Sequence, residues 1–242
     1  VVSGTQPKKV LQILKQRAEA LRCPFICADE KQALLLKEDY DGQLLSYKGI
    51  EKVYCPLAGR HQIGNVVTAL ETVFTLRTLG YHITEAALRQ GLKETVWLGR
   101  FTCIGTNPLF IIDGAHNEDA ARRLRETLEI YFPEKHFIYI VGVFRDKEYE
   151  EIAKIMGPLA KSVHTVKLPD SARTLPASEL AKVMRRHCKN GISIQAEDSI
   201  KMAVKNALTE AKETDILLSF GSLSYLGQVM SDFELLSASS MA

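Results

Sequence analysis

The spacing of apolar residues changes part-way along this chain. Between Ile63 and Phe74 the apolar positions fall three and four residues apart, which is typical of an amphipathic helix, and Gly80 follows where such a helix ends. From Phe101 onward, short apolar runs alternate with longer amphipathic stretches. Because strands that alternate with helices are joined by crossovers, the second part predicts a parallel, doubly wound α/β sheet.

The same pattern predicts the individual elements. In the first part we expect a helix after Pro7, a short strand at 25–28, strands at 43–49 and 51–57, the long helix from Ile63 to Gly80 and a helix capped by Thr84. In the second part we expect strands at 108–113, 137–143, 162–167, 192–195 and 215–220, with helices at 117–131, 147–157, 176–191, from Asp198 to about Lys212, and after Gly221. The stretch 94–100 predicts a linker between the two parts.

The composition indicates the class of protein but does not identify a binding partner. The 242 residues are 46% hydrophobic and 25% charged, which suits one large or two modest domains. With 31 basic and 29 acidic residues, the chain favours neither a nucleic acid nor an anionic membrane as partner, and no apolar run is long enough to span a bilayer. The five cysteines are scattered and lack zinc spacing, so we expect reduced thiols in a cytoplasmic protein and no metal ligands.

Polar residues gather at three predicted strand ends. The segments are Asp113-Gly114-Ala115-His116-Asn117, Phe144-Arg145-Asp146-Lys147 and Gly221-Ser222. Because ligands bind where parallel strands end, we expect these segments to share one edge of the sheet and to form a site. A structural interpretation stays open for each segment: Asp113 or Asn117 as a helix cap, His116 as a structural histidine, Arg145 and Lys147 in a solvated turn, and Gly221-Ser222 as a strand-to-helix connection.

Two earlier segments have a similar character. In "LAGRHQIGN" (57–65), Asn65 either helps to cap the long helix or binds a ligand. In the linker, Arg100 is either a solvated hinge residue or a phosphate ligand. The chain contains no Gly-x-x-x-x-Gly-Lys-Ser/Thr phosphate loop, no Gly-x-Gly-x-x-Gly, no His-Glu-x-x-His and no Gly-x-Ser-x-Gly. No single motif therefore defines the chemistry.

The order of the motifs resembles the folylpolyglutamate synthase family, including its bifunctional dihydrofolate synthase members. The resemblance rests on "LAGRHQIGN", "WLGRF", "IIDGAHNEDAARRL", "VGVFRDKE" and "LSFGSLSYLG", and it is weak over 1–56. It implies a Rossmann-like, mostly parallel α/β domain of the Mur ligase C-terminal type at 98–242, preceded at 1–97 by the C-terminal part of a phosphate-loop ATPase domain. Because the phosphate loop is absent, we expect a fragment that lacks an upstream part.

The resemblance also implies an activity. In this family ATP phosphorylates the γ-carboxylate of a folate glutamyl tail, or the pteroate carboxylate in dihydrofolate synthesis, and the amine of L-glutamate attacks the acyl phosphate. Magnesium and basic side chains share the phosphate charge. The implied ligands are ATP, Mg²⁺ on upstream residues, folate or dihydropteroate, and L-glutamate, bound by a monomer. The fragment alone is expected to be inactive.

Carried over residue by residue, the resemblance implies a nucleotide site. Asn65 would contact the nucleotide from the ATPase domain, Arg100 would reach the phosphates, and Asp113 would touch the nucleotide from the other domain, so that binding draws the domains together. The candidates on the glutamate or acyl-phosphate side are His116 and Ser222, and more weakly Arg145 and Lys147.

Two other functions stay open at this point. One is a Mur-type peptidoglycan ligase, which shares the ATP site and the C-terminal domain. The Asp-Gly-Ala-His-Asn motif argues against it. The other is a non-catalytic α/β binding module in which the polar strand ends are only caps. The sequence encoded before Val1 would distinguish them, because a phosphate loop there favours a ligase.

Overall fold

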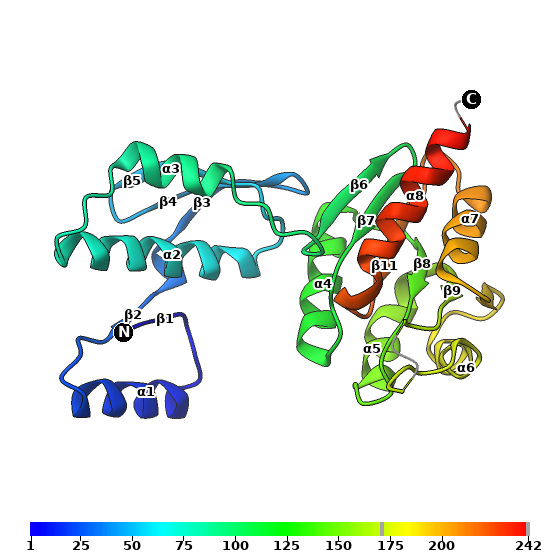
Figure 1. The fold of residues 1–242 in the computed structure, drawn as a ribbon, viewed down its shortest axis with the longest axis horizontal. Coiled ribbons are helices and arrows are strands. Elements are labelled where there is room, and N and C mark those ends of the chain that lie inside the picture. The colour runs from blue at the N-terminus through cyan, green and yellow to red at the C-terminus, as the bar shows by residue number, and fades with distance from the viewer. Residues whose placement is uncertain (170–171, 241–242) are drawn as a thin grey trace. The chain divides into compact units, whose positions relative to one another are not determined.

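The computed structural model describes residues 1–169 and 172–240. The chain divides into two compact units, Val1–Val96 and Trp97–Ala242 (Figure 1). Within the described residues, no helix combines the length and the apolar composition that a membrane crossing requires.

The first unit combines two small sheets with three helices. Its elements are β1 (Val2–Ser3), α1 (Lys8–Ala20), β2 (Ile26–Cys27), the 3₁₀ turn η1 (Glu30–Gln32), β3 (Leu34–Asp39), β4 (Gly42–Tyr47), β5 (Ile50–Cys55), α2 (His61–Thr78) and α3 (Glu85–Lys93). Strands β1 and β2 pair in parallel, while β3, β4 and β5 form an antiparallel sheet. Leu45, Tyr47, Val67 and Leu70 belong to the buried core between this antiparallel sheet and the helices.

One carboxylate is enclosed in this core. Glu71 of α2 is 5% exposed and accepts hydrogen bonds from the Tyr47 hydroxyl at 2.6 Å and the Lys48 ammonium at 2.5 Å. Burial alone would raise the pKa of Glu71, but these two donors lower it below its usual value. The buried charge is thereby compensated and ties α2 to β4.

The second unit is a doubly wound α/β domain. Its helices are α4 (Glu118–Tyr131), α5 (Tyr149–Met156), α6 (Ala177–His187), α7 (Ile200–Glu210) and α8 (Leu226–Ser240), with 3₁₀ turns η2 (Gly157–Leu159) and η3 (Leu223–Tyr225). In sheet order, its strands are β10 (Ser193–Ala196), β9 (Ala160–Thr165), β8 (Phe137–Val141), β11 (Ile216–Phe220), β7 (Leu109–Ile112) and β6 (Thr102–Thr106). All neighbours pair in parallel except β6, which is antiparallel to β7. The predicted parallel α/β sheet is confirmed.

Helices cover both faces of the six-stranded sheet, which explains its continuous apolar strands. Every residue of β8 is buried: Ile138 and Ile140 belong to the core that α7 and α8 close. On the opposite face, the Tyr139 hydroxyl donates to the Met156 carbonyl at the end of α5. Successive residues of a strand point to opposite faces, so a strand of this kind carries an apolar residue at every position.

The structure differs from the sequence expectations at two strands and one helix cap. The structure contains two strands that the pattern did not predict, β3 and β6, both at the edge of a sheet. Helix α7 is capped by Ser199, whose hydroxyl accepts from the Met202 N–H at 3.1 Å, and not by Asp198. The predicted cap Thr84 is confirmed, since its hydroxyl accepts from the Ala87 N–H at 3.1 Å.

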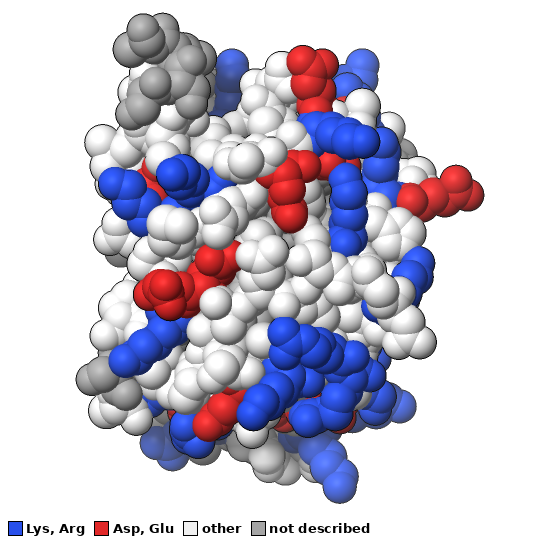
Figure 2. Space-filling model, turned by 90° about the vertical axis from the view of Figure 1, so that its right-hand side faces the viewer, with Lys and Arg blue, Asp and Glu red and all other residues white. Residues whose placement is uncertain are grey.

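Charged side chains of both signs lie close together on the surface. The face drawn in Figure 2 shows acidic and basic residues interspersed, with one group of Lys and Arg toward its lower right. Along α4, Arg123 pairs with Asp119 and Arg125 pairs with Glu129, each one helical turn apart. Exposed pairs of this kind contribute little stability, so the apolar cores account for most of it.

Candidate functional site

Three polar strand ends meet at one edge of the second unit's sheet. Strand β11 lies between β8 and β7, so their carboxyl ends are neighbours. The Asp113 N–H donates to the Ser219 carbonyl at 2.9 Å, which extends the pairing past the end of β7. The prediction that the segments after β7, β8 and β11 share an edge is therefore confirmed.

Glycines allow these strand ends to approach one another closely. Gly221 has a φ of +114°, and a Cβ atom there would lie 2.3 Å from the Gly142 carbonyl oxygen. At Gly114 a Cβ atom would lie 2.3 Å from the Leu223 side chain. Real Cβ atoms do not come this close to their neighbours, so only glycine fits between these backbones.

The Gly99-Arg100 turn is fastened to the end of β7. The Gly114 N–H donates to the Gly99 carbonyl at 2.7 Å, and the Phe101 N–H donates to Asp113 Oδ2 at 2.8 Å. Phe101 has a φ of +45°, in the left-handed region that non-glycine residues rarely adopt. Its ring is buried and meets Tyr131 edge-on at 5.9 Å, which offsets the backbone cost. The turn is thus held in one conformation.

Arg100 lies in this fixed turn with its guanidinium free. The side chain is half-buried, and among residues 1–169 and 172–240 it has neither an ion pair nor a hydrogen bond. Most other arginines of the second unit, such as Arg122 and Arg186, are paired with a carboxylate. A half-buried guanidinium on a rigid turn is suited to a planar anion such as a carboxylate or a phosphate.

Asp113 holds the turn through both of its carboxylate oxygens. Oδ2 accepts from the Phe101 N–H and Oδ1 accepts from the Ala115 N–H, each at 2.8 Å. Burial raises the pKa of Asp113 to about 6, although the two backbone donors and the nearby Arg100 act in the opposite direction. Asp113 does not cap α4; its visible role is to position Arg100.

His116 and Asn117 follow with different roles. The Asn117 side chain caps α4 by accepting from the Ala120 N–H at 2.9 Å, as the structural interpretation predicted. His116 Nδ1 lies 2.8 Å from the Gly114 carbonyl, and only an N–H can bond to that oxygen. In the neutral ring Nε2 is therefore the unprotonated nitrogen, free to accept a proton.

Ser222 is occupied within its own loop. It is 5% exposed and caps the turn η3, with its Oγ 3.2 Å from the Ser224 N–H and 2.9 Å from Ser224 Oγ. The loop is held from behind by Tyr225, whose buried hydroxyl lies 2.7 Å from the Phe220 carbonyl and 3.0 Å from Ser219 Oγ. Burial raises the pKa of Tyr225 well above its usual value, so this hydroxyl stays protonated.

Replacing Tyr225 by phenylalanine tests this anchoring. The change keeps the ring and removes a hydroxyl that contacts Ser219 Oγ and the Ile140 and Phe220 carbonyls, so the free energy of unfolding is expected to fall by about 1–3 kcal/mol. Urea unfolding monitored by circular dichroism measures it. Tyr149→Phe is the matched control, because the Tyr149 hydroxyl has no partner among the described residues. Equal stability of both variants would show that the Tyr225 hydroxyl anchors nothing.

The loop after β8 carries the weaker candidates. Arg145 is exposed and lies 3.5 Å from Glu179, and its N–H donates to the Arg173 carbonyl. Lys147 is half-buried, with its N–H bonded to the Phe144 carbonyl. These contacts agree with a solvated, hydrogen-bonded turn, and the residues stay candidates only.

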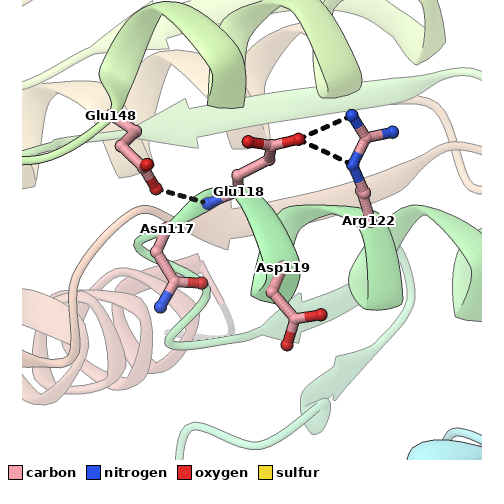
Figure 3. A pocket seen from close by; sticks show the side chains of 5 residues that line it. All are labelled: Asn117, Glu118, Asp119, Arg122 and Glu148. Carbon is pink, nitrogen blue, oxygen red and sulfur yellow. Dashed lines mark hydrogen bonds and ion pairs between the residues drawn. The ribbon is translucent and has the colours of Figure 1, made fainter. Parts of the chain in front are cut away.

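A cavity of about 410 Å³ lies beside the start of α4 (Figure 3). It is lined by Asn117, Glu118, Asp119, Arg122 and Glu148. The Glu118 N–H donates to Glu148 Oε2 at 3.2 Å, and the Arg122 guanidinium is paired with Glu118. Because the cavity has three carboxylates against one guanidinium, it disfavours phosphate groups, and Arg100 stays the better candidate for them.

Asn65 belongs to the first unit, in the first turns of α2. It is exposed, and its Nδ2 donates to the Oε1 of the buried Gln62 at 2.7 Å. The Asn65 side chain therefore does not cap the helix, and its Oδ1 is the atom left for a ligand. Within the described residues, no group of three or more His, Cys, Asp or Glu side chains could hold a metal ion.

The family model described as the Mur ligase, glutamate ligase domain matches residues 99–223. This chain belongs to that family. The matched residues include Arg100, Asp113, His116 and Ser222, whereas Asn65 lies outside the match.

Members with longer chains resemble this glutamate ligase domain and the unit before it. The dihydrofolate synthase/folylpolyglutamate synthase of Bacillus subtilis (strain 168) is 26% identical over 235 residues, which are 95% of this chain and 53% of that protein. The folylpolyglutamate synthase of Lacticaseibacillus casei is 33% identical over 141 residues, covering 57% of this chain and 31% of that protein. The chain therefore spans about half the length of the first of these relatives.

A solved structure shares the fold of this Mur ligase family member. Mycobacterium tuberculosis folylpolyglutamate synthase, in complexes with ADP and AMPPCP, aligns with a TM-score of 0.82 at 24% identity, covering 96% of this chain and 54% of that one. At this level of identity the comparison establishes the fold alone.

The sequence pattern did not single out every residue that shapes the site. Phe101, Leu223 and Tyr225 lie within the quoted motifs, yet nothing in their spacing shows that Phe101 is left-handed or that Leu223 covers Gly99 and Gly114. The only sequence feature that indicated these contacts was the presence of glycine at the three strand ends. Close approach explains that signal.

Proposed function

We propose that this chain is part of an ATP-dependent ligase that joins L-glutamate to the γ-carboxylate of folates. The observation that carries the proposal is the Arg100 guanidinium, which has no hydrogen bond or ion pair among the described residues and lies on a turn that Asp113 holds at the carboxyl edge of the sheet. The relatives named above support the substrate class, because their names include folylpolyglutamate synthase and dihydrofolate synthase. Formation of dihydrofolate from dihydropteroate is the second reaction that this proposal includes.

The reaction needs an activated carboxylate. Transfer of the γ-phosphoryl group of ATP to a carboxylate oxygen of the folate releases ADP and gives an acyl phosphate. The glutamate amine then attacks the acyl carbon and a C–N bond forms. The acyl C–O bond breaks, phosphate departs with the former carboxylate oxygen, and the nitrogen, an ammonium in free glutamate, loses two protons and keeps one as the amide. A carboxylate alone is a poor electrophile, and phosphate supplies the leaving group.

The residues of this chain have distinct parts in the proposal. Arg100 neutralises phosphate charge, and Asp113 keeps Arg100 in place. His116 Nε2, unprotonated in the neutral ring, accepts a proton on the glutamate side. Ser222 contributes there more weakly, because its hydroxyl already caps η3. In the first unit, Asn65 contacts the nucleotide through Oδ1.

Two ligands of the reaction differ in how the chain accommodates them. Arg100 suits the nucleotide phosphates by charge and because, within the described part of the chain, its guanidinium makes no hydrogen bond or ion pair. The described residues provide no carboxylate or histidine cluster for magnesium, so no step is assigned through that ion.

The proposal is tested with the complete gene product, including all sequence that its gene encodes around these residues. We expect ADP release that depends on both L-glutamate and a reduced folate, together with a product one glutamate longer by mass spectrometry. A parallel assay with dihydropteroate tests the second reaction. Ligation to a nucleotide-linked peptidoglycan precursor instead, or the absence of any ADP release, would refute the folate proposal.

The 242 residues alone are expected to be inactive. They contain no phosphate loop, so the same assay should show no glutamate-dependent ADP release above background. The measurement uses the purified chain at high concentration, with the complete gene product as the positive control. Ligation by the isolated chain would contradict this expectation and would require a phosphate-binding element of another kind.

A further inference from the structure

One buried side chain of the first unit holds the loop that leads into α2. Gln43 of β4 is 2% exposed, and its Nε2 donates to the Leu57 carbonyl at 2.9 Å and to the Gly59 carbonyl at 2.8 Å. Both protons of the amide are thus used on the same loop. Gly59 has a φ of +97°, in the left-handed region that glycine adopts without strain, so the loop turns sharply at the carbonyl that Gln43 binds.

This arrangement is not what core packing alone would select. The Oε1 atom of Gln43 is buried and has no partner among the described residues. An unpaired buried carbonyl of this kind costs about 1–3 kcal/mol, which an apolar side chain of the same shape would avoid. The neighbouring Gly42 lets β4 approach the end of β5, where the loop begins, since a Cβ atom there would lie 2.5 Å from the Cys55 carbonyl oxygen. Stability alone therefore does not explain a glutamine here.

The loop connects Gln43 to Asn65 through a short series of hydrogen bonds. The Gly59 carbonyl that Gln43 holds also accepts the Gln62 N–H at 2.9 Å, in the first turn of α2. The Gln62 side chain is 4% exposed, and its Oε1 accepts from Asn65 Nδ2 at 2.7 Å. Every link in this series is buried or part-buried up to the exposed Asn65.

We propose that Gln43 is a positioning residue for nucleotide binding: by fixing the Gly59 carbonyl it sets the start of α2 and, through Gln62, the orientation of the Asn65 amide. This inference rests on the proposed role of Asn65 as a nucleotide contact. Gln43 itself touches no ligand. Its effect is on affinity for the nucleotide, because a misplaced Asn65 weakens a contact made equally before and during the reaction.

The first arm of the test measures ATP binding by the complete gene product. Gln43→Met keeps the length of the side chain and removes both donors. We expect the dissociation constant of a non-hydrolysable ATP analogue, and the KM for ATP, to rise about 5–10-fold, while kcat stays within about twofold. Gln12→Met is the matched control: Gln12 is an exposed glutamine of α1, and its substitution should leave both constants unchanged.

The second arm measures the loop itself in the same complete gene product. Hydrogen exchange followed by mass spectrometry should show faster exchange in peptides covering residues 59–65 of Gln43→Met, with α3 and the second unit unchanged. If Gln43→Met does not fold, Gln43→Asn provides the same comparison, because its shorter amide cannot span both carbonyls.

The outcomes separate the two proposals. Faster loop exchange with an unchanged ATP affinity would make Gln43 a structural residue only and would overturn the inference. Unchanged exchange would overturn it as well. Failure of the wild-type protein to ligate glutamate, with the expected loss of ATP affinity in Gln43→Met, would refute the folate reaction and leave the positioning role supported. A wild-type protein that does not bind the analogue would overturn both.

Discussion

Replacing Arg100 by alanine is expected to lower kcat/KM for glutamate ligation by about 10²–10³-fold while leaving thermal stability unchanged. The first effect follows from the proposed phosphate contact, since a preorganised cation in a partly buried site stabilises developing charge strongly. The second follows from the structure: the guanidinium has no hydrogen bond or ion pair among the described residues, so its removal leaves no donor or acceptor unsatisfied. A truncation that lowered activity by disrupting the fold would lower kcat/KM and thermal stability together.

The measurement is steady-state ADP release by the complete gene product, together with a thermal melt of the same samples. Arg100→Lys should be intermediate, because it keeps the charge and loses the planar pair of donors. Arg123→Ala is the matched control, since Arg123 forms an exposed pair with Asp119 on α4. A parallel loss of activity and stability in Arg100→Ala would indicate a structural hinge residue, and unchanged kcat/KM would remove Arg100 from the phosphate site.

The sheet of the second unit was predictable because its signals are local. Strands such as β8 and β11 are buried on both faces, so they appear as continuous apolar runs between amphipathic helices. Strand β6 lacked that signal. It lies at the edge of the sheet, carries Gly105, and is only partly buried, so its sequence contains no apolar run. Its existence depends on pairing with β7, which residue spacing does not show.

The first unit was harder to predict for the same reason. Strand β3 contains three consecutive leucines followed by charged residues, without the alternation that identifies a half-buried strand. Leu34 and Leu36 are exposed. The pairing of β3 with β4, which includes an irregular register near Leu35, determines its structure. Tertiary contacts here override the local pattern.

The sequence predicted which edge of the sheet carries the candidate site, but it did not predict the contacts within that site. Topology alone places the ends of β7, β8 and β11 together, which is why Asp113 and Ser222 were found as candidates. The hydrogen bond from the Phe101 N–H to Asp113 depends on a left-handed residue next to Arg100, and no sequence rule identifies phenylalanine for that conformation. The role of Gln43 was equally hidden, because a glutamine in a strand is ordinarily an exposed residue.

Replacing Asp113 by alanine is expected to weaken turnover of the complete gene product about as strongly as Arg100→Ala, but with a loss of stability as well. The carboxylate accepts from the Phe101 and Ala115 N–H groups, and its removal leaves both donors without their partner. Each buried donor left unsatisfied costs about 1–3 kcal/mol. Activity and urea unfolding, measured on the same preparations, test this difference from Arg100→Ala. Wild-type stability in Asp113→Ala would show that the two hydrogen bonds to Asp113 do not stabilise the turn.

The pH dependence of stability gives Asp113 a signature of its own. Its pKa is raised from 3.8 to about 6, so the folded protein binds the proton more tightly than the unfolded chain does. The stability that protonated Asp113 contributes is therefore complete below about pH 4 and is lost as the pH rises through 6. A shift of about two pH units corresponds to roughly 3 kcal/mol. We expect the wild-type protein to lose about this much relative to Asp113→Asn between pH 4 and pH 7.

Asp215 supplies a control of opposite sign. Burial would raise the pKa of Asp215, but the Lys161 ammonium at 2.6 Å and the Lys212 N–H lower it below its usual value. Its contribution to stability is present above about pH 4 and is lost as the pH falls below that value, so the difference between wild type and Asp215→Asn should have the reverse slope. Urea unfolding measures the Asp113 pair from pH 4 to pH 7 and the Asp215 pair from about pH 2 to about pH 5, where each carboxyl titrates. If the Asp113 and Asp215 differences slope the same way, then Asp113 is ionised at acidic pH, and the buried environment assigned to it is wrong.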